Sequence, residues 1–113
     1  MYQVDLYNKA LAQGTAYSNV VNLATYRLPA WQFALSYILE SAGAATLTLT
    51  IQYSWNKSTW IDGAEILSTG AVGSALVAVD EAVNKLYPMK YLRFKILVAD
   101  ADATKVFLSL GLA

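Results

Sequence analysis

The sequence has no histidine and no cysteine, and these two absences exclude much of the common chemistry of enzymes and metal sites. Without histidine, the most frequent general base and the most frequent metal ligand are both missing, and a Ser–His–Asp triad cannot form. Without cysteine there is no disulfide, no thiolate ligand and no cysteine nucleophile. We therefore expect a protein that is not an enzyme and that holds no cofactor and no metal ion.

Charged residues are also scarce. They make up 14% of the 113 residues, while hydrophobic residues make up 57%; ordinary soluble domains carry about 25% charged and about 45–50% apolar residues. The eight basic and eight acidic residues cancel, and the densest basic group is Lys90, Arg93 and Lys95. Nucleic-acid binding needs a more concentrated cationic surface, so we expect none. The apolar surplus indicates surface that is buried against another chain.

Long uninterrupted apolar runs are absent as well. The charge-free stretches 10–26 and 41–56 are interrupted by Gln, Asn, Ser, Thr and Gly, whereas a membrane-spanning helix needs roughly 20 mostly apolar residues. The first residues, Met1–Asp5, lack the basic and apolar regions of a signal peptide. We therefore expect a single domain over residues 1–113 that contacts no membrane.

The clearest positive signal is the alternation in residues 46–55, TLTLTIQYSW. Successive side chains of a strand point to opposite faces, so this pattern predicts a strand with one apolar and one polar face. Trp55 shares the apolar parity, and we expect it to be buried. The polar residues 56–58 interrupt the pattern before Thr59–Ile61 resumes it. This predicts a hairpin, and it leaves open whether Trp60 faces the core, a neighbouring chain or a ligand.

Similar patterns predict further strands. Residues 33–40, 90–98 and 104–112 each place their large apolar side chains on one face, and residues 2–7 and 17–23 alternate more weakly. Turn signals recur about every ten residues, and seven to nine short strands with this spacing are typical of an antiparallel sandwich. The predicted fold is all-β, a single antiparallel β-sandwich that is jelly-roll-like.

Two local signals concern the connections between these strands. Asp62-Gly63 predicts a turn after the hairpin. Residues 80–87 carry apolar side chains at helical spacing, with acidic residues first and Pro88 after them. This pattern predicts one short helix, with an irregular loop as the alternative.

Three pairs of carboxylates lie close together in the sequence. They are Asp62 and Glu65, Asp80 and Glu81, and Asp100 and Asp102. A glycosidase needs two carboxyl groups about 5–10 Å apart across a cleft, and Ca²⁺ needs six to eight oxygen ligands. Each pair lies beside a predicted turn or helix start, where such residues form local hydrogen bonds. We interpret these carboxylates as structural. The alternative is a small enzyme, which would need a pair of carboxylates that meet only in the folded chain.

Aromatic residues supply the candidate contacts, since the chain has three Trp and eight Tyr. Such rings either fill a core or a subunit interface, or stack on the faces of sugars. Trp60 and Tyr91 lie on faces that the pattern leaves undecided. Phe107 lies on the second, partly apolar face of the last strand. These three residues are the candidate interface or ligand contacts.

Three segments together resemble a known group of proteins. They are the block QYSWNKSTWID (Gln52–Asp62), the strand YPMKYLRFK (Tyr87–Lys95) and the apolar last strand. Over residues 33–112 the chain resembles small β-sandwich virion proteins of tailed bacteriophages, which include head decoration and other capsid- or tail-associated proteins. Related blocks appear in carbohydrate-binding and discoidin-like sandwiches. None of these families implies a catalytic residue.

The resemblance implies a structural protein of the virion, assembled in the host cytoplasm. Such a protein binds the capsid surface as decoration or cement, or binds another virion component. The expected partners are further copies of the chain, in a homo-oligomer such as a trimer, and other virion proteins such as a major capsid protein. Residues 1–9 are expected to form a strand or an arm that pairs with a neighbouring subunit. The alternative function is a carbohydrate-binding module used in attachment, with a glycan as its ligand.

Overall fold

The computed structural model describes residues 2–22, 33–41, 43–70, 73–79 and 91–112. Nine strands make up its regular structure, and the described residues include no helix. The strands are β1 (Tyr2–Leu11), β2 (Gly14–Tyr17), β3 (Val21–Asn22), β4 (Phe33–Glu40), β5 (Thr46–Ser54), β6 (Trp60–Thr69), β7 (Gly73–Val79), β8 (Tyr91–Ala99) and β9 (Ala103–Leu112). The predicted all-β class is confirmed. The helix predicted at residues 80–87 lies outside the described residues.

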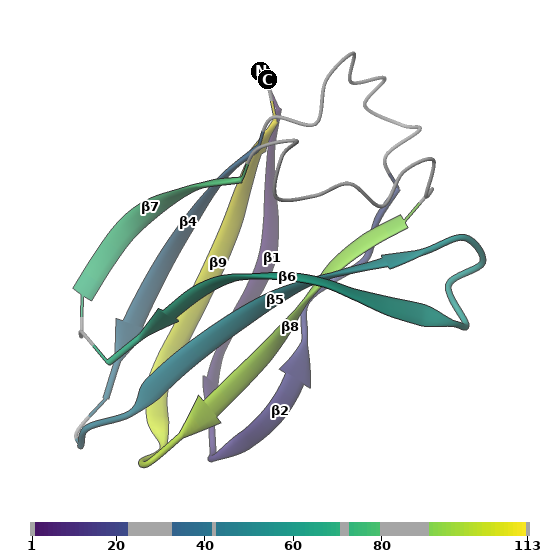
Figure 1. Ribbon diagram of the computed structural model, residues 1–113. Helices are drawn as coiled ribbons and strands as arrows, with labels where there is room; N and C mark the ends of the chain where they lie inside the picture. The colour runs from purple at the N-terminus through teal and green to yellow at the C-terminus, as the bar shows by residue number, and fades with distance from the viewer. Residues whose placement is uncertain (1, 23–32, 42, 71–72, 80–90, 113) are drawn as a thin grey trace.

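The strands form two sheets that face each other as layers (Figure 1). Sheet A has the order β1-β9-β4-β7, and sheet B has the order β2-β8-β5-β6, with the short β3 also paired to β8. Every pairing is antiparallel. In Figure 1, β5, β6 and β8 pass in front of β1 and β9. The molecule is therefore an antiparallel β-sandwich, as the strand spacing predicts.

The pairing is nested around the hairpin of β5 and β6. Outside that hairpin β4 pairs with β7, then β2 and β3 pair with β8, and finally β1 pairs with β9. The chain is thus a long hairpin that is rolled up, so that β4 also meets β9 and β5 also meets β8. This is the arrangement of a jelly roll, in which most connections cross from one sheet to the other.

The core lies between the two sheets and follows the predicted alternation. One parity of each central strand is buried, and its members are Leu35, Tyr37 and Leu39 of β4, Leu47, Leu49, Ile51 and Tyr53 of β5, Leu92, Phe94, Ile96 and Val98 of β8, and Val106, Leu108 and Leu110 of β9. Each such large apolar side chain stabilises the fold by about 1.5–3 kcal/mol relative to an exposed position. The inward faces predicted for these strands are confirmed for the residues named.

The predicted turn at Asp62-Gly63 is wrong, because both residues lie inside β6. In the pairing of β5 with β6, Gln52 is opposite Asp62 and Thr50 is opposite Glu65, so two residues of β6 face the single residue Ile51. An extra residue of this kind is a β-bulge, which bends a strand without ending it. Gly63 suits the bulge because a Cβ there would lie 2.9 Å from the Cγ2 atom of Ile51.

The N-terminal segment forms a strand that pairs within its own chain. Residues of β1 lie opposite β9 from Tyr2 and Leu112 to Leu11 and Ala103, with two register shifts between them. β1 is an edge strand of sheet A. The predicted pairing of this segment with a neighbouring subunit stays a prediction, and it concerns the edge of β1 that does not pair with β9.

In the described part of the chain, no helix has the length and apolar character needed to cross a membrane.

Candidate functional site

Two of the three predicted contact residues lie together on the outer face of sheet B. Trp60 of β6 and Tyr91 of β8 are both paired with Ser54, the last residue of β5, so they flank it in one row across three strands. Phe107 lies on sheet A, opposite Ile38 of β4, and its neighbours Val106 and Leu108 point into the core. Trp60 and Tyr91 therefore belong to one site, and Phe107 lies on the opposite face of the sandwich.

The prediction that Trp55 is buried is wrong, since 62% of its surface is exposed. The parity that predicted burial holds only while the chain stays in the sheet, and β5 ends at Ser54. The Ser54 hydroxyl accepts hydrogen bonds from the backbone N–H groups of Asn56 at 3.2 Å and Lys57 at 2.9 Å. These hydrogen bonds turn the chain away from the direction of the strand. Trp55 therefore lies outside the core.

Side chains close the hairpin as a compact turn. The Asn56 side-chain oxygen accepts the backbone N–H groups of Ser58 and Thr59, each at 2.9 Å. The Ser54 hydroxyl also donates to the Thr59 carbonyl at 2.7 Å. Lys57 adopts a φ of 66°, in the left-handed region. Asn and Ser favour such turns because their short polar side chains replace backbone partners. The turn therefore gives Trp60 a fixed position.

Trp60, which the sequence left undecided, is half-buried on the outer face of sheet B. Its indole Nε1 donates a hydrogen bond to the Lys57 carbonyl at 3.1 Å. Its ring lies 4.1 Å from the Cζ atom of Arg93, and the same Cζ lies 4.0 Å from the ring of Tyr17 on β2. The guanidinium is thus held between two rings, an arrangement that cation–π attraction stabilises.

A row of hydrogen-bonded polar side chains fixes the position of the Arg93 guanidinium. Arg93 Nε donates to Gln52 Oε1 at 2.8 Å, and Gln52 Nε2 donates to Asp62 Oδ1 at 2.6 Å. Guanidinium only donates and carboxylate only accepts, so these two partners determine which way the amide of Gln52 points. The three residues are opposite one another on β8, β5 and β6. Gln52 is only 6% exposed, and both ends of its amide are satisfied.

We call Tyr17, Trp60, Tyr91 and Arg93 the aromatic cluster. Tyr17 is 46% exposed, and the ring of Tyr91 has the ammonium of Lys57 at 4.8 Å. Burial lowers the pKa of the Arg93 guanidinium, and the nearby Tyr17 opposes that shift. Arginine nevertheless keeps its charge in proteins at neutral pH. The cluster is thus a partly exposed set of rings that holds Arg93 against Tyr17 and Trp60, with Lys57 against Tyr91.

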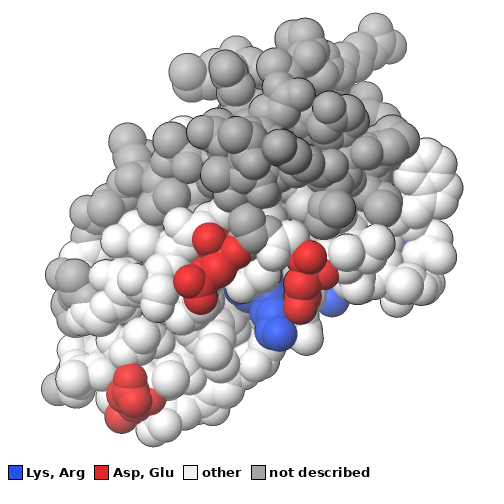
Figure 2. Space-filling model, in the orientation of Figure 1, with Lys and Arg blue, Asp and Glu red and all other residues white. Residues whose placement is uncertain are grey.

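The rest of this face carries both signs of charge and one large exposed apolar side chain, Leu97. Lys95 follows Arg93 on the same face of β8, and it lies opposite Thr50, which in turn lies opposite Glu65. Figure 2 shows acidic side chains on either side of basic ones in the middle of the visible face. Such a face can contact polar ligands and charged surfaces, and it contrasts with the apolar interior of the sandwich.

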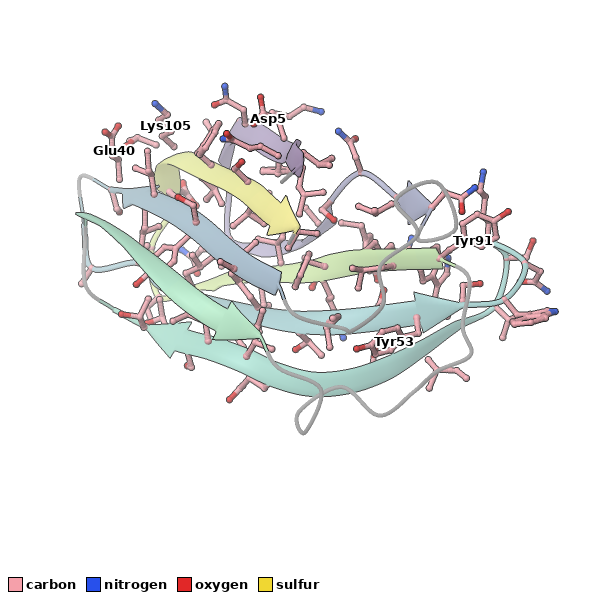
Figure 3. All side chains as sticks on the ribbon, turned by 90° about the horizontal axis from the view of Figure 1, so that it is seen from above. Asp5, Glu40, Tyr53, Tyr91 and Lys105 are labelled. Carbon is pink, nitrogen blue, oxygen red and sulfur yellow. The ribbon has the colours of Figure 1, made fainter. Side chains whose placement is uncertain are left out.

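The opposite face, on sheet A, has a different character. Phe107 and Ile38 lie opposite each other there, both half-buried, and Glu40 lies opposite Lys105 at one end. Gln3 Nε2 donates to Ser109 Oγ at 3.0 Å. Figure 3 shows Asp5, Glu40 and Lys105 pointing away from sheet B. Phe107 is therefore a surface contact of small extent, remote from the aromatic cluster.

Three described carboxylates of the predicted pairs, Asp62, Asp100 and Asp102, accept hydrogen bonds that join separate segments of the fold. Asp100 has a φ of 71° and its Oδ2 accepts the Thr46 hydroxyl at 2.7 Å, while Asp102 Oδ1 accepts the backbone N–H of Gln13 at 2.9 Å. Asp62 bonds to Gln52 as described above. The pair at residues 80 and 81 lies outside the described residues. Among the described residues, no group of three or more His, Cys, Asp or Glu is placed to hold a metal ion.

Sequence reasoning missed three residues of the site. Arg93 shares the parity of Tyr91, and Gln52 stands on the polar parity of its strand, so both could have been assigned to the outer face of one sheet. Tyr17 lies on a strand of four residues, and its place beside Arg93 depends on how β2 pairs with β8.

No protein-family model matches the chain, and no curated protein matches it. The geometry of the site is therefore the basis for a functional proposal.

Proposed function

We propose that this chain is a non-enzymatic structural protein of a bacteriophage virion, which attaches to another virion component through the aromatic cluster. The observation that carries the proposal is the convergence of Trp60, Tyr17, Tyr91 and Arg93 on one end of sheet B. Trp, Tyr and Arg are the residue types most enriched at the energetic centres of protein interfaces. The cluster gives a rigid, partly exposed anchor of that composition.

Two further observations support the proposal. The jelly roll is used by viral capsid domains and by lectins, although a fold alone does not decide function. The block QYSWNKSTWID, on which the resemblance to phage virion proteins rests, is the hairpin of β5 and β6 and carries Trp60. The segment that resembles those proteins thus supplies part of the aromatic cluster.

The proposal includes association of the chain with itself. The low charge content and net charge of zero favour self-association over repulsion. A homo-oligomer on a repeating lattice binds by several weak contacts at once, so that its total affinity exceeds that of one contact by about 10²–10⁴-fold. A mass measurement of the purified chain tests this part, and a monodisperse monomer would contradict it.

Attachment is tested with particles of the phage that encodes the chain. We expect the chain in purified particles at a fixed ratio to the capsid protein, and we expect purified chain to rebind particles from a deletion mutant. Trp60→Ala should weaken rebinding by about 30-fold or more, since loss of an interface anchor costs about 2 kcal/mol or more. Phe107→Ala, on the opposite face, is the matched control and should leave rebinding nearly unchanged. Particles that lack the chain, or wild-type rebinding by Trp60→Ala, would refute the proposal.

One observation favours a second candidate, a carbohydrate-binding module for attachment. Trp55 exposes 62% of its surface at the hairpin, where an indole ring could stack on a sugar. Glycan-array binding that is lost in Trp55→Ala, while rebinding to particles persists, would support this candidate. An array without signal would count against it.

A further inference from the structure

We infer that Arg93 is a receptor for a carboxylate group, and that the protein surface that contacts the aromatic cluster presents an Asp or Glu side chain to it. This inference rests on the proposed function, because it names the chemistry of the partner at the same site. It is argued from the donors of Arg93, from the way its position is fixed, and from the charges around it.

Most of the hydrogen-bond donors of Arg93 have no partner among the described residues. A guanidinium has five N–H donors, of which one belongs to Nε and four to Nη1 and Nη2. Nε is bonded to Gln52, and in the described part of the chain no hydrogen bond or ion pair reaches Nη1 or Nη2. The two Nη groups form the fork that binds a carboxylate through two parallel hydrogen bonds.

The fork is held in position before any ligand arrives. Rings of Tyr17 and Trp60 lie at 4.0 and 4.1 Å from Cζ, and Gln52 anchors Nε through its own bond to Asp62. A long side chain that is already fixed loses little further conformational entropy on binding. The site is therefore suited to bind one carboxylate more tightly than a mobile surface arginine would.

The surrounding charges favour a singly charged ligand. The nearest acidic group in the row, Asp62, reaches Arg93 only through Gln52, so the cation is not directly neutralised by it. Glu65 lies on the same strand as Asp62, and both would repel a doubly charged phosphate. Lys95 and Lys57 offset part of that repulsion. An Asp or Glu side chain brings one negative charge and the planar shape that the fork accepts.

The test is an NMR titration of the ¹⁵N-labelled full chain. The probes are N-acetyl-aspartate-N-methylamide, its neutral asparagine counterpart, and inorganic phosphate. The signals followed are Arg93 Nε–H and Trp60 Nε1–H, because the second donates to the Lys57 carbonyl beside the site. We expect saturable shifts with the aspartate probe, no saturable shift with the asparagine probe, and weaker binding of phosphate.

Two variants identify the group responsible. Arg93→Lys keeps the charge and removes the fork, and it should weaken binding of the aspartate probe about tenfold or more. Lys95→Gln removes a charge from the same face of the same strand, and it should change the affinity less than threefold. The inference is overturned if the wild-type chain shows no saturable shift, if both variants lose affinity equally, or if phosphate binds more tightly than the aspartate probe.

The outcomes separate this inference from the proposed function. If the chain rebinds particles through Trp60 but the titration shows no carboxylate binding, only the inference fails. If the isolated chain binds the aspartate probe through Arg93 but is absent from particles, the assignment to a virion fails and the carboxylate site stands. Arg93→Lys that binds particles like the wild type would show that the partner does not use the site.

Discussion

Ser54 holds the hairpin that carries the aromatic cluster, and its replacement by Ala should destabilise the protein measurably. Its hydroxyl accepts two backbone N–H groups and donates to the Thr59 carbonyl, and the side chain is almost completely buried. A net hydrogen bond is worth about 0.5–1.5 kcal/mol. The groups that lose a partner belong to the exposed residues 56–59, where water can replace the hydroxyl. We therefore expect a loss of about 1–3 kcal/mol in the free energy of unfolding.

Urea denaturation, followed by circular dichroism and tryptophan fluorescence, measures this loss. For a urea dependence of about 1–3 kcal/mol per molar, the midpoint for Ser54→Ala should fall by about 1 M. Ser68→Ala is the matched control: it is exposed on β6, and its hydroxyl has only a 3.3 Å contact with Thr48. A surface change of this kind should stay within about 0.5 kcal/mol. Equal midpoints for the two variants would refute the role given to Ser54.

Two further predictions concern the interior. Burial raises the pKa of the Tyr53 phenol well above its ordinary value. The contribution of Tyr53 to the free energy of unfolding should therefore be constant below about pH 10. Above that pH it should fall by up to about 1.4 kcal/mol per pH unit, because the unfolded state loses this proton first. Tyr53→Phe should remove that part of the slope in urea titrations at pH 9–11.5, with exposed Tyr17→Phe as the control. Gly63→Ala would place a Cβ 2.9 Å from side-chain atoms of Ile51 and Tyr53 and should cost about 1–3 kcal/mol in the same assay. Gly70→Ala, where a Cβ meets open space, should be neutral or slightly stabilising, and equal effects of the two changes would refute the packing argument.

The alternation in the sequence predicted most of the fold correctly. Apolar parity identified the buried faces of β4, β5, β8 and β9. Each strand of a two-layer sandwich turns one face to the other sheet and the opposite face to the surface. The same reasoning failed at Trp55, where Ser54 bonds to the backbone and ends the strand. The turn predicted from the residue types Asp62-Gly63 is also wrong, because a bulge in β6 accommodates these residues within the strand. Both errors come from local hydrogen bonding or packing that neither hydrophobic parity nor a turn dipeptide reveals.

The candidate site was predicted only in part. The sequence predicts Trp60 and Tyr91 as contacts from their residue type, and the structure places them on either side of Ser54. Phe107, predicted from the partly apolar second face of the last strand, lies on the other sheet. In the sequence Arg93 stands out only as part of a weak basic group, since its contact with Tyr17 depends on pairing between residues far apart in the sequence.

The sequence by itself determined the class of fold and the limits of the chemistry. Alternating side chains require strands with one buried face, and a chain without His or Cys lacks the commonest catalytic and metal-binding groups. The tertiary structure alone decided which residues meet. Nested pairing places Tyr17 of β2, Arg93 of β8, Gln52 of β5 and Asp62 of β6 side by side. Such neighbours depend on the register between strands, where a shift of one residue would turn each side chain to the other face.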